Sequence, residues 1–328
     1  MSETFHNRSL SELSFLVTGG AGFIGGHLAE YLLKNGAKKV RVIDNLVNGF
    51  QSNIDILKQY SAFEFAEGDI TNFAFCLQSC KDIDYVTHQA ALGSVPRSIK
   101  EPSYTNDVNV GGFVNILKAA VDNNVKQFVY ASSSSVYGDE PTLPKREDRI
   151  GNSLSPYAVS KRANELYAQV FADVYKMPVI GLRYFNIFGP RQDPDGPYAA
   201  VIPLFVKGII KKKPVYINGD GEQTRDFTFV NNAVQVNILS MLTQKKEAIN
   251  KVYNVATGEK FSVNYLYNVV KNHLNSDHEA TYREPREGDI RNSLADISLA
   301  KNLLGYKPSV KFEDGLKVTI EYFKQIYL

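Results

Sequence analysis

The sequence predicts an α/β protein in which a parallel sheet, covered by helices on both faces, is followed by a smaller α/β region. From residue 13 short β-branched or aromatic runs alternate with longer helical patterns, and this alternation ends near residue 187. A chain of 328 residues, 44% of them hydrophobic, is long enough to bury a large core. Strand and helix in this order build a doubly wound parallel sheet, because each helix returns the chain to the same end of the sheet.

The expected strands of the first region are the runs SFLVTG, KVRVID, FEFAEGDI, DYVTHQA, QFVYASSS and VIGLRYFNIFG. We expect helices at about 23–35 and 108–122, and a third that begins at Ser155 and Pro156, a preferred N-cap followed by a preferred first helical residue. The helix at 108–122 carries an apolar stripe that predicts core packing. Its members are Val110, Phe113, Val114, Leu117 and Val121.

The second region begins with the Pro-, Gly- and Asp-rich segment GPRQDPDGPYAA and mixes short strands with helices. Its sheet-like pieces PVYINGDGEQTRDFTFV and KVYNVATGEKFSV are separated by a helical pattern at about 231–243, so the chain is expected to cross between regions more than once. We therefore assign residues 1–185, with about 227–256, to the first domain. Residues 186–226 and 257–328 form the second.

Composition excludes several classes of function. The formal net charge is +2 and the basic residues are dispersed apart from KGIIKKKP, interpreted as a solvated helix end, so no nucleic-acid partner is expected. The two cysteines, Cys76 and Cys80, suit one helix face in a reducing compartment, and the five histidines lack metal-ligand spacing. The N-terminus is polar and no run of about 18 apolar residues occurs, which indicates a cytoplasmic protein without a membrane partner.

A glycine loop follows the first expected strand. In FLVTGGAGFIGGHL, Gly19, Gly22 and Gly25 allow a tight turn, close approach of the backbone to a pyrophosphate, and packing of the next helix. The helix N-terminus then favours the negative phosphates. Asp44, which ends the next strand, can accept hydrogen bonds from the ribose hydroxyls of an adenosine and would repel a 2′-phosphate. This context predicts NAD as the cofactor.

Two further strand ends suit the same cofactor. Asp69 and Ile70 in EGDI lie where an adenine is expected, although Asp69 can also be an exposed turn carboxylate. The small residues of HQAAL, at 88–92, permit a close approach of the backbone.

A serine run, ASSSSVYGD, ends another strand at the edge where open α/β sheets bind ligands. About 24 residues after Ser133, Tyr157 and Lys161 lie one turn apart on one helix face. A phenol is a weak base at neutral pH, but a nearby ammonium group and a positive nicotinamide ring would lower its pKa. Tyr157 could then take a proton from a sugar hydroxyl while a serine shares the hydrogen bond.

Together these residues resemble the extended short-chain dehydrogenase/reductase family, and within it the nucleotide-sugar epimerases. The motifs that carry the resemblance include TGGAGFIG, GDI, HQAA, NVGGFVNIL, SSSSVYG, PYAVSK, LRYFNIFGPRQ, NGDGEQTRDF, VYNVATG and REGDIRNSLAD, and they span nearly the whole chain. The resemblance implies a Rossmann-type NAD-binding first domain, a nucleotide-sugar-binding second domain, and Ser133, Tyr157 and Lys161 as catalytic residues. It also implies that NAD is bound by Gly19, Gly22, Phe23, Ile24, Gly25, Asp44, Asn45, Asp69, Ile70, Gln89, Ala90, Ala91, Asn109, Tyr157, Lys161 and Tyr184.

The serines at 134 and 135 narrow the reaction. Dehydratases of the family carry Asp-Glu there, and decarboxylases of UDP-glucuronate usually keep a Glu at the second position. Without either acid, the resemblance implies 4-epimerisation, in which Tyr157 removes the proton of the sugar 4-OH and NAD takes the hydride from C4.

The resemblance also implies a UDP-sugar substrate. Asn186, Arg225 and Arg286 resemble the residues that hold the diphosphate, and Asp289 resembles the acid that holds the uridine ribose. Ser293 is small where epimerases restricted to glucose and galactose carry a bulky residue, which leaves room for a 2-acetamido group. The remaining expected substrate residues are Gly93, Ser94, Ser133, Ser134, Ser135, Tyr157, Gln192, Ala200, Val201, Tyr216 and Asn218.

The segments ALGSVPRS and RQDP with YAAVIP look like the O-antigen type of UDP-N-acetylglucosamine 4-epimerase. UDP-glucose and UDP-uronic acids stay open as substrates, since Arg97 or Arg191 could meet a C6 carboxylate. A non-catalytic NAD-binding regulator is a further alternative, but such proteins often lose the Tyr-Lys pair. Family members pair through two helices, so we expect a homodimer formed by the helices at 108–122 and 156–175.

Overall fold

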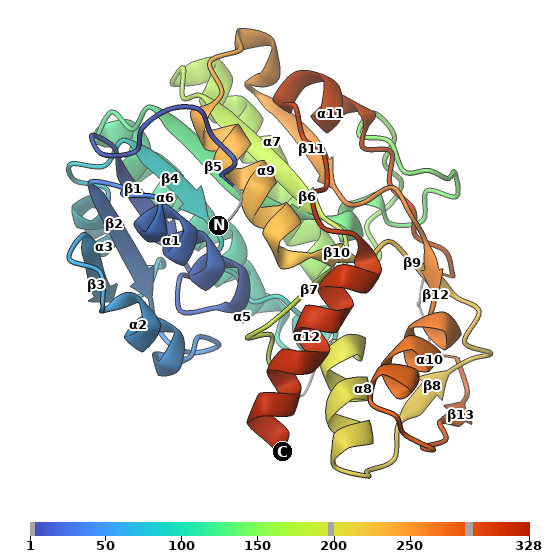
Figure 1. Cartoon of the computed structure of the whole chain (residues 1–328). Helices are drawn as coiled ribbons and strands as arrows, with labels where there is room; N and C mark the ends of the chain where they lie inside the picture. Colours follow the sequence, from blue (N-terminus) through green and yellow to red (C-terminus); the bar gives the residue numbers. More distant parts are fainter. Residues whose placement is uncertain (1–3, 196–199, 286–290) are drawn as a thin grey trace.

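The computed structural model describes residues 4–195, 200–285 and 291–328, and a seven-stranded parallel sheet forms its centre (Figure 1). The strand order is β11-β6-β5-β4-β1-β2-β3. The order reverses between β1 and β4, and such a switch point opens a crevice at the carboxyl ends of the strands. The strands are β1 (Ser14–Thr18), β2 (Lys39–Asp44), β3 (Phe63–Glu67), β4 (Tyr85–His88), β5 (Gln127–Ser133), β6 (Val179–Tyr184) and β11 (Lys251–Val255).

Helices cover both faces of this sheet, as the alternating sequence pattern predicts. On one face lie α1 (Phe23–Lys34), α2 (Gln51–Leu57), α9 (Val230–Leu242) and α11 (Ser298–Leu304). On the other lie α3 (Phe73–Ser79), α4 (Val95–Lys100), α5 (Pro102–Asn106), the π-helical segment η1 (Asp107–Gly112), α6 (Phe113–Asp122) and α7 (Pro156–Val174). The sheet strands are apolar on both sides because each side faces one of these two cores.

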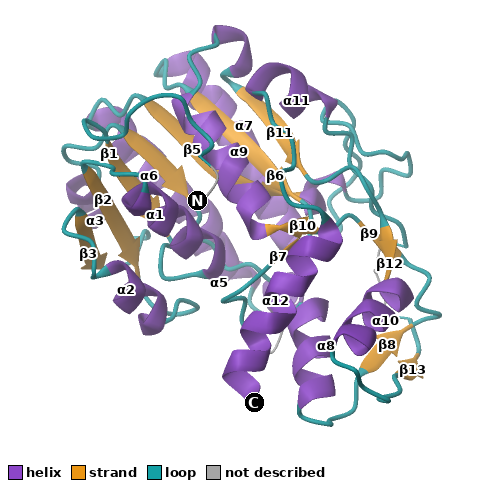
Figure 2. Ribbon diagram, viewed as in Figure 1, coloured by secondary structure: helices purple, strands orange, loops and turns teal. Residues whose placement is uncertain are grey.

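A separate core holds the smaller region, drawn at the lower right of Figure 2. It contains β7 (Ile187–Phe188), α8 (Val201–Ile210), β8 (Tyr216–Asn218), β9 (Thr224–Arg225), β10 (Thr228–Phe229), β12 (Phe261–Ser262), α10 (Val263–His273), β13 (Thr281–Arg283) and α12 (Phe312–Tyr327). Between β10 and β12 the chain returns to the main sheet through α9 and β11. The chain therefore crosses more than once between the two units, while the proposed domain boundaries stay a prediction.

Several elements differ in detail from the sequence expectation. The run VIGLRYFNIFG forms two strands, β6 and β7, because Asn186 between them adopts a positive φ of 37°. The expected helix at 108–122 begins within the π-helical segment η1 and continues as α6. Of its apolar stripe, Phe113 and Leu117 are fully buried, and the other members are partly buried. The described residues also contain two short 3-10 helices, η2 (Ser134–Tyr137) and η3 (Lys246–Ala248).

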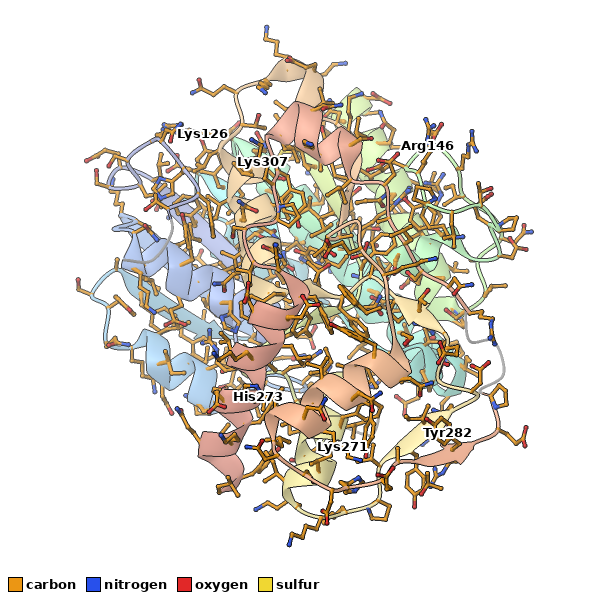
Figure 3. All side chains as sticks on the ribbon, turned by 45° about the vertical axis from the view of Figure 1, so that its right-hand side comes forward. Lys126, Arg146, Lys271, His273, Tyr282 and Lys307 are labelled. Atoms are coloured by element: carbon orange, nitrogen blue, oxygen red, sulfur yellow. The ribbon has the colours of Figure 1, made fainter. Side chains whose placement is uncertain are left out.

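The positively charged side chains labelled in Figure 3 lie in different parts of the view. Figure 3 places Lys126, Arg146 and Lys307 in the upper half of the view and Lys271 in the lower half. His273 lies near Lys271 on α10 and pairs with Glu321 of α12 at 2.8 Å, so it ties two helices of the smaller unit together. Within the described ranges, no helix combines the length and the apolar character needed to cross a bilayer.

Candidate active site

A cavity of about 990 Å³ lies at the carboxyl ends of β1, β2, β4, β5 and β6. It brings together most of the site residues predicted from sequence, although they come from segments nearly 200 residues apart. Those that line it are Gly19, Gly22, Phe23, Ile24, Gly25, Asp44, Asn45, Ile70, Gln89, Ala90, Ala91, Gly93, Ser94, Ser133, Ser134, Tyr157, Lys161, Tyr184, Asn186, Gln192 and Ala200. The cavity therefore joins the predicted cofactor residues to part of the predicted substrate residues.

The glycine turn between β1 and α1 leaves no room for side chains. Gly19 has a φ of +68°, and a Cβ on it would lie 2.7 Å from the backbone nitrogen of Ala90. A Cβ on Gly25 would overlap the carbonyl oxygen of Gly19. The first turn of α1 thus opens directly into the cavity, where its unpaired N–H groups and dipole favour a phosphate.

Asp44 ends β2 with a buried carboxylate. One oxygen accepts a hydrogen bond from the Ala21 N–H at 3.0 Å, and the other accepts one from the Leu46 N–H at 2.8 Å. Burial raises the pKa of Asp44, and these backbone hydrogen bonds act in the opposite direction. Held in this way beside the glycine turn, the carboxylate has lone pairs left for ribose hydroxyls. The turn and the acid fit NAD, which these residues would hold by its pyrophosphate and adenosine ribose.

Tyr157 and Ser133 meet on the far side of the cavity. The phenol of Tyr157 is hydrogen-bonded to Ser133, and the Nζ of Lys161 lies 5.9 Å from the centre of the Tyr157 ring. Lys161 is buried and donates to the carbonyl oxygen of Ala131 at 2.9 Å. Its burial lowers the pKa of Lys161 to about 8.

The pKa of Tyr157 differs from the expectation. Burial raises it, and the hydrogen bond from Ser133 only partly opposes that effect. The expected lowering relied on two positive charges, Lys161 and the nicotinamide ring. In the chain without NAD, the desolvation that disfavours the phenolate outweighs the stabilisation of the phenolate by the Ser133 hydrogen bond.

The first turn of α7 is held in place from several sides. Ser155 accepts a hydrogen bond from the Ala158 N–H at 3.1 Å, as the predicted N-cap should. Ser98 of α4 accepts one from the Tyr157 N–H at 3.0 Å. Asn109 lies behind the cavity wall, where its amide bonds the backbone of Leu92 and the hydroxyl of Ser160. In this geometry Asn109 connects the segment after β4 to α7 behind the cavity wall. Its predicted contact with NAD stays a prediction.

The other predicted residues that do not line the cavity fall into three groups. Asp69 and Ser135 lie next to it: Asp69 accepts a hydrogen bond from Asn45 at 2.8 Å, and the Ser135 hydroxyl is buried without a partner in the described chain. Val201, Tyr216, Asn218, Arg225 and Ser293 belong to the smaller unit. Arg286 and Asp289 lie outside the described residues.

The residues of the smaller unit form a neighbourhood of their own. The guanidinium of Arg283 lies 3.0 Å from the centre of the Tyr216 ring, where β13 pairs with β8. The Ser293 N–H donates to the carbonyl oxygen of Thr224, the residue before Arg225. Arg225 donates to the carbonyl oxygens of Thr224 and Arg291. Ser293 and Arg225 thus lie close together, as two residues that bind the same substrate would need to.

The sequence reading missed part of the cavity lining. Residues 46–50 line it, and so do Tyr104 and Asp193. The segment at 46–50 could have been predicted, because it leaves the carboxyl end of a strand beside the glycine turn. Tyr104 and Asp193 carry no such signal.

The positions of Arg97 and Arg191 distinguish the two arginines considered for a C6 carboxylate. Arg97 lines the cavity and donates to the Asn48 side chain at 3.1 Å, so it lies toward the loop after β2. Arg191 turns away from the cavity toward α1, where it pairs with Glu30 at 2.8 Å.

Comparison with known proteins agrees with this site. Residues 15–256 match the model of the NAD dependent epimerase/dehydratase family. A UDP-glucose 4-epimerase of Mycolicibacterium smegmatis is 34% identical over 94% of this chain and 98% of its own length.

Two solved structures share the fold over almost the whole chain. The UDP-N-acetylglucosamine 4-epimerase of Methanobrevibacter ruminantium, in complex with UDP-N-acetylmuramic acid, is 39% identical with a TM-score of 0.91, covering 96% of this chain and 99% of that one. The UDP-glucuronic acid 4-epimerase of Bacillus cereus, in complex with UDP-glucuronic acid and NAD, is 34% identical with a TM-score of 0.89, covering 96% and 100%.

The chain therefore belongs to the NAD-dependent epimerase/dehydratase family, and its cofactor is NAD. The Rossmann-type fold and the resemblance to nucleotide-sugar epimerases are confirmed.

Proposed function

We propose that this member of the NAD-dependent epimerase/dehydratase family interconverts UDP-GlcNAc and UDP-GalNAc by epimerisation at C4. The observation that carries the proposal is the cavity itself, which joins the glycine turn and Asp44 to Tyr157 and Ser133, with a serine at position 134 in its wall. Serines at 134 and 135 supply hydroxyls where water elimination would need an acid and a base.

In the proposed reaction Tyr157 accepts the proton of the sugar 4-OH and later returns it, with the Ser133 hydroxyl sharing the hydrogen bond. Lys161 is the buried cation one helical turn away, and it stabilises the phenolate form of Tyr157. NAD bound beside them would supply a reversible hydride acceptor for C4, so that the 4-keto sugar can be reduced again from its opposite face.

An acetamido sugar is favoured by the small residues at one end of the cavity. Gly93, Ser94 and Ala200 line it, and a Cβ on Gly93 would meet no atom within 4 Å. We also assign a place beside the acetamido group to Ser293, a small residue of the smaller unit. We further assign the diphosphate to Asn186, Arg225 and Arg286, and the uridine ribose to Asp289. The remaining predicted substrate residues keep their proposed roles.

The rival substrates are UDP-glucose and the UDP-uronic acids. The Mycolicibacterium smegmatis relative is a UDP-glucose 4-epimerase, and the Bacillus cereus structure is a UDP-glucuronic acid 4-epimerase. Asp193 lines the cavity, while Arg191 is paired with Glu30. A negative side chain in the wall disfavours a second carboxylate nearby, so we prefer a sugar with an uncharged C6 group. Arg97 is the cavity residue that would favour a uronic acid instead.

The decisive experiment incubates the purified chain with UDP-GlcNAc, UDP-Glc, UDP-GlcA and UDP-GlcNAc-uronate, and follows each 4-epimer by chromatography. We expect fastest conversion of UDP-GlcNAc and a loss of about 10²–10⁴-fold in Tyr157→Phe, the usual contribution of a positioned acid-base group. Rapid turnover of UDP-Glc beside unchanged UDP-GlcNAc would contradict the substrate, and full activity of Tyr157→Phe would contradict the mechanism. The Tyr157→Phe protein should still contain NAD.

The proposed setting is the cytoplasm. Cys76 and Cys80 are both unpaired and buried, as suits a reducing compartment.

A further inference from the structure

The segment that leaves β7, residues 190–193, contributes two residues to the cavity wall. Gln192 and Asp193 line the cavity, and the Gln192 amide donates to the carbonyl oxygen of Ile187 at 3.1 Å. Between Pro190 and Gln192, the side chain of Arg191 points the other way. The contacts of the Arg191 side chain therefore influence the positions of Gln192 and Asp193 in the cavity wall.

The Arg191 side chain is clamped to α1, the helix whose first turn faces the cofactor. One guanidinium nitrogen lies 2.8 Å from a carboxylate oxygen of Glu30 and 2.6 Å from Nδ1 of His27. The side chain is only 8% exposed. His27 also bonds the carbonyl oxygen of Pro190 through Nε2 at 3.0 Å. An imidazole that donates from Nε2 and accepts at Nδ1 is neutral, which suits a position against a guanidinium.

The Arg191 backbone is held from a third direction. Its N–H donates to the hydroxyl of Tyr322 in α12, which belongs to the smaller unit. Arg191 has a φ of +66°, a conformation that is unfavourable for a residue with a side chain. Such a conformation persists only where the surroundings hold it, and here α1 and α12 both do so.

We propose that Arg191 is a positioning residue that fastens the 190–193 segment to α1 and α12 and thereby sets Gln192 and Asp193 at the substrate end of the cavity. Arg191 does not touch the substrate in this assignment, and it acts through its neighbours. The Arg191 guanidinium then connects α1 to the cavity wall, together with the hydrogen bond between His27 and the Pro190 carbonyl oxygen. The effect on catalysis rests on the proposed function, whereas the effect on the segment itself does not.

The test uses Arg191→Met, which keeps most of the side-chain length and removes the charge. We expect KM for UDP-GlcNAc to rise about tenfold, the effect of losing one charge-assisted hydrogen bond, with kcat and the NAD content close to wild type. Hydrogen exchange of residues 186–195 should accelerate, because the guanidinium contacts with Glu30 and His27 are lost, while the His27–Pro190 hydrogen bond remains. Arg191→Lys, which keeps the charge beside Glu30, should restore part of both properties.

Arg41→Met is the matched control. Arg41 makes a comparable pair with Glu64 at 2.9 Å and also bonds the carbonyl oxygens of Ser79 and Lys81, but it lies at the β2–β3 edge of the sheet. It should leave KM and the exchange of 186–195 unchanged.

Hydrogen exchange tests the role of Arg191 without any substrate, whereas the turnover assay tests the proposed function. Equal exchange and equal KM in Arg191→Met and wild type would overturn the positioning role. A wild-type protein that converts no UDP-sugar would overturn the proposed function, and the exchange data would still decide on Arg191. Should Arg191→Met fail to fold, Glu30→Gln removes the same ion pair and is read by the same measurements.

Discussion

At the scale of single residues, the site depends on charged and polar groups that are buried with partners from distant segments. Lys161 of α7 donates to the carbonyl oxygen of Ala131 on β5, and Asp44 is held by the backbone of the glycine turn. Arg183 and Glu165 form a fully buried pair at 2.8 Å, and the hydroxyl of Ser132 bonds the same carboxylate. Removing either member of this pair would leave a buried charge without a partner. Because Glu165 lies on α7, Ser132 on β5 and Arg183 on β6, these contacts fix α7 relative to the two strands.

His27 gives the folded state a predictable dependence on pH. Burial and the charge of Arg191 lower the pKa of His27 to about 4, against an ordinary value of 6.5; Lys34 acts in the same direction, and Glu30 opposes them. Since the unfolded chain takes up the proton first, this histidine's contribution to stability is complete above about pH 6.5. It is lost progressively as the pH falls toward 4.

We therefore expect His27→Gln to weaken the pH dependence of folding. Between pH 7 and pH 5 the wild-type free energy of unfolding should fall by about 2 kcal/mol more than that of His27→Gln. Urea denaturation at the two pH values measures this difference. Parallel losses in both proteins would show that His27 is not buried as a neutral group.

At the scale of elements, the β1–α1 turn determines whether NAD can be held. Gly25→Ala should lower the free energy of unfolding by about 2 kcal/mol, because the added methyl overlaps the Gly19 carbonyl and forces the turn open. It should also yield protein without bound NAD, as measured by the nucleotide released on denaturation. Gly111→Ala is the control, since a Cβ there meets nothing within 4 Å. Normal NAD content in Gly25→Ala would contradict the role given to this turn.

At the scale of the whole molecule, α7 presents an unusual exposed apolar face. Val159, Leu166, Val170 and Val174 are each more than half exposed, at 56%, 54%, 51% and 65%. They repeat at helical spacing along the outer side of the helix, and a contiguous apolar strip of this kind marks an interface. This face supports the homodimer that we propose through the helices at 108–122 and 156–175, whereas Phe171 on the inner side of α7 is buried in the core.

Val170→Glu should shift the protein from dimer to monomer, because a carboxylate buried at the seam would have no partner. Size-exclusion chromatography with light scattering measures the mass directly. Val318→Glu on α12 is the matched control, since Val318 is also half exposed, at 50%, but lies on the smaller unit. A monomeric wild type, or a dimer unaffected by Val170→Glu, would contradict this interface.

The sequence by itself determined the main sheet, the cofactor turn and the Tyr157–Lys161 pair. Each depends on local rules: KVRVID alternates into a strand, glycines permit the turn, and Ser155 caps α7 within three residues of itself. Periodicity and capping depend on residues a few positions apart, so they can be recognised in the sequence without the tertiary structure.

Only the tertiary structure decided what surrounds those groups. Nothing local indicates that Arg191 turns toward Glu30, that Asp193 enters the cavity wall, or that Ser98 bonds the backbone of Tyr157. That burial raises the pKa of Tyr157 in the chain without NAD could not be predicted from the sequence either, because burial depends on every segment that packs around the phenol. Local patterns determine which elements form, whereas desolvation and long-range contacts exist only once the whole chain has packed.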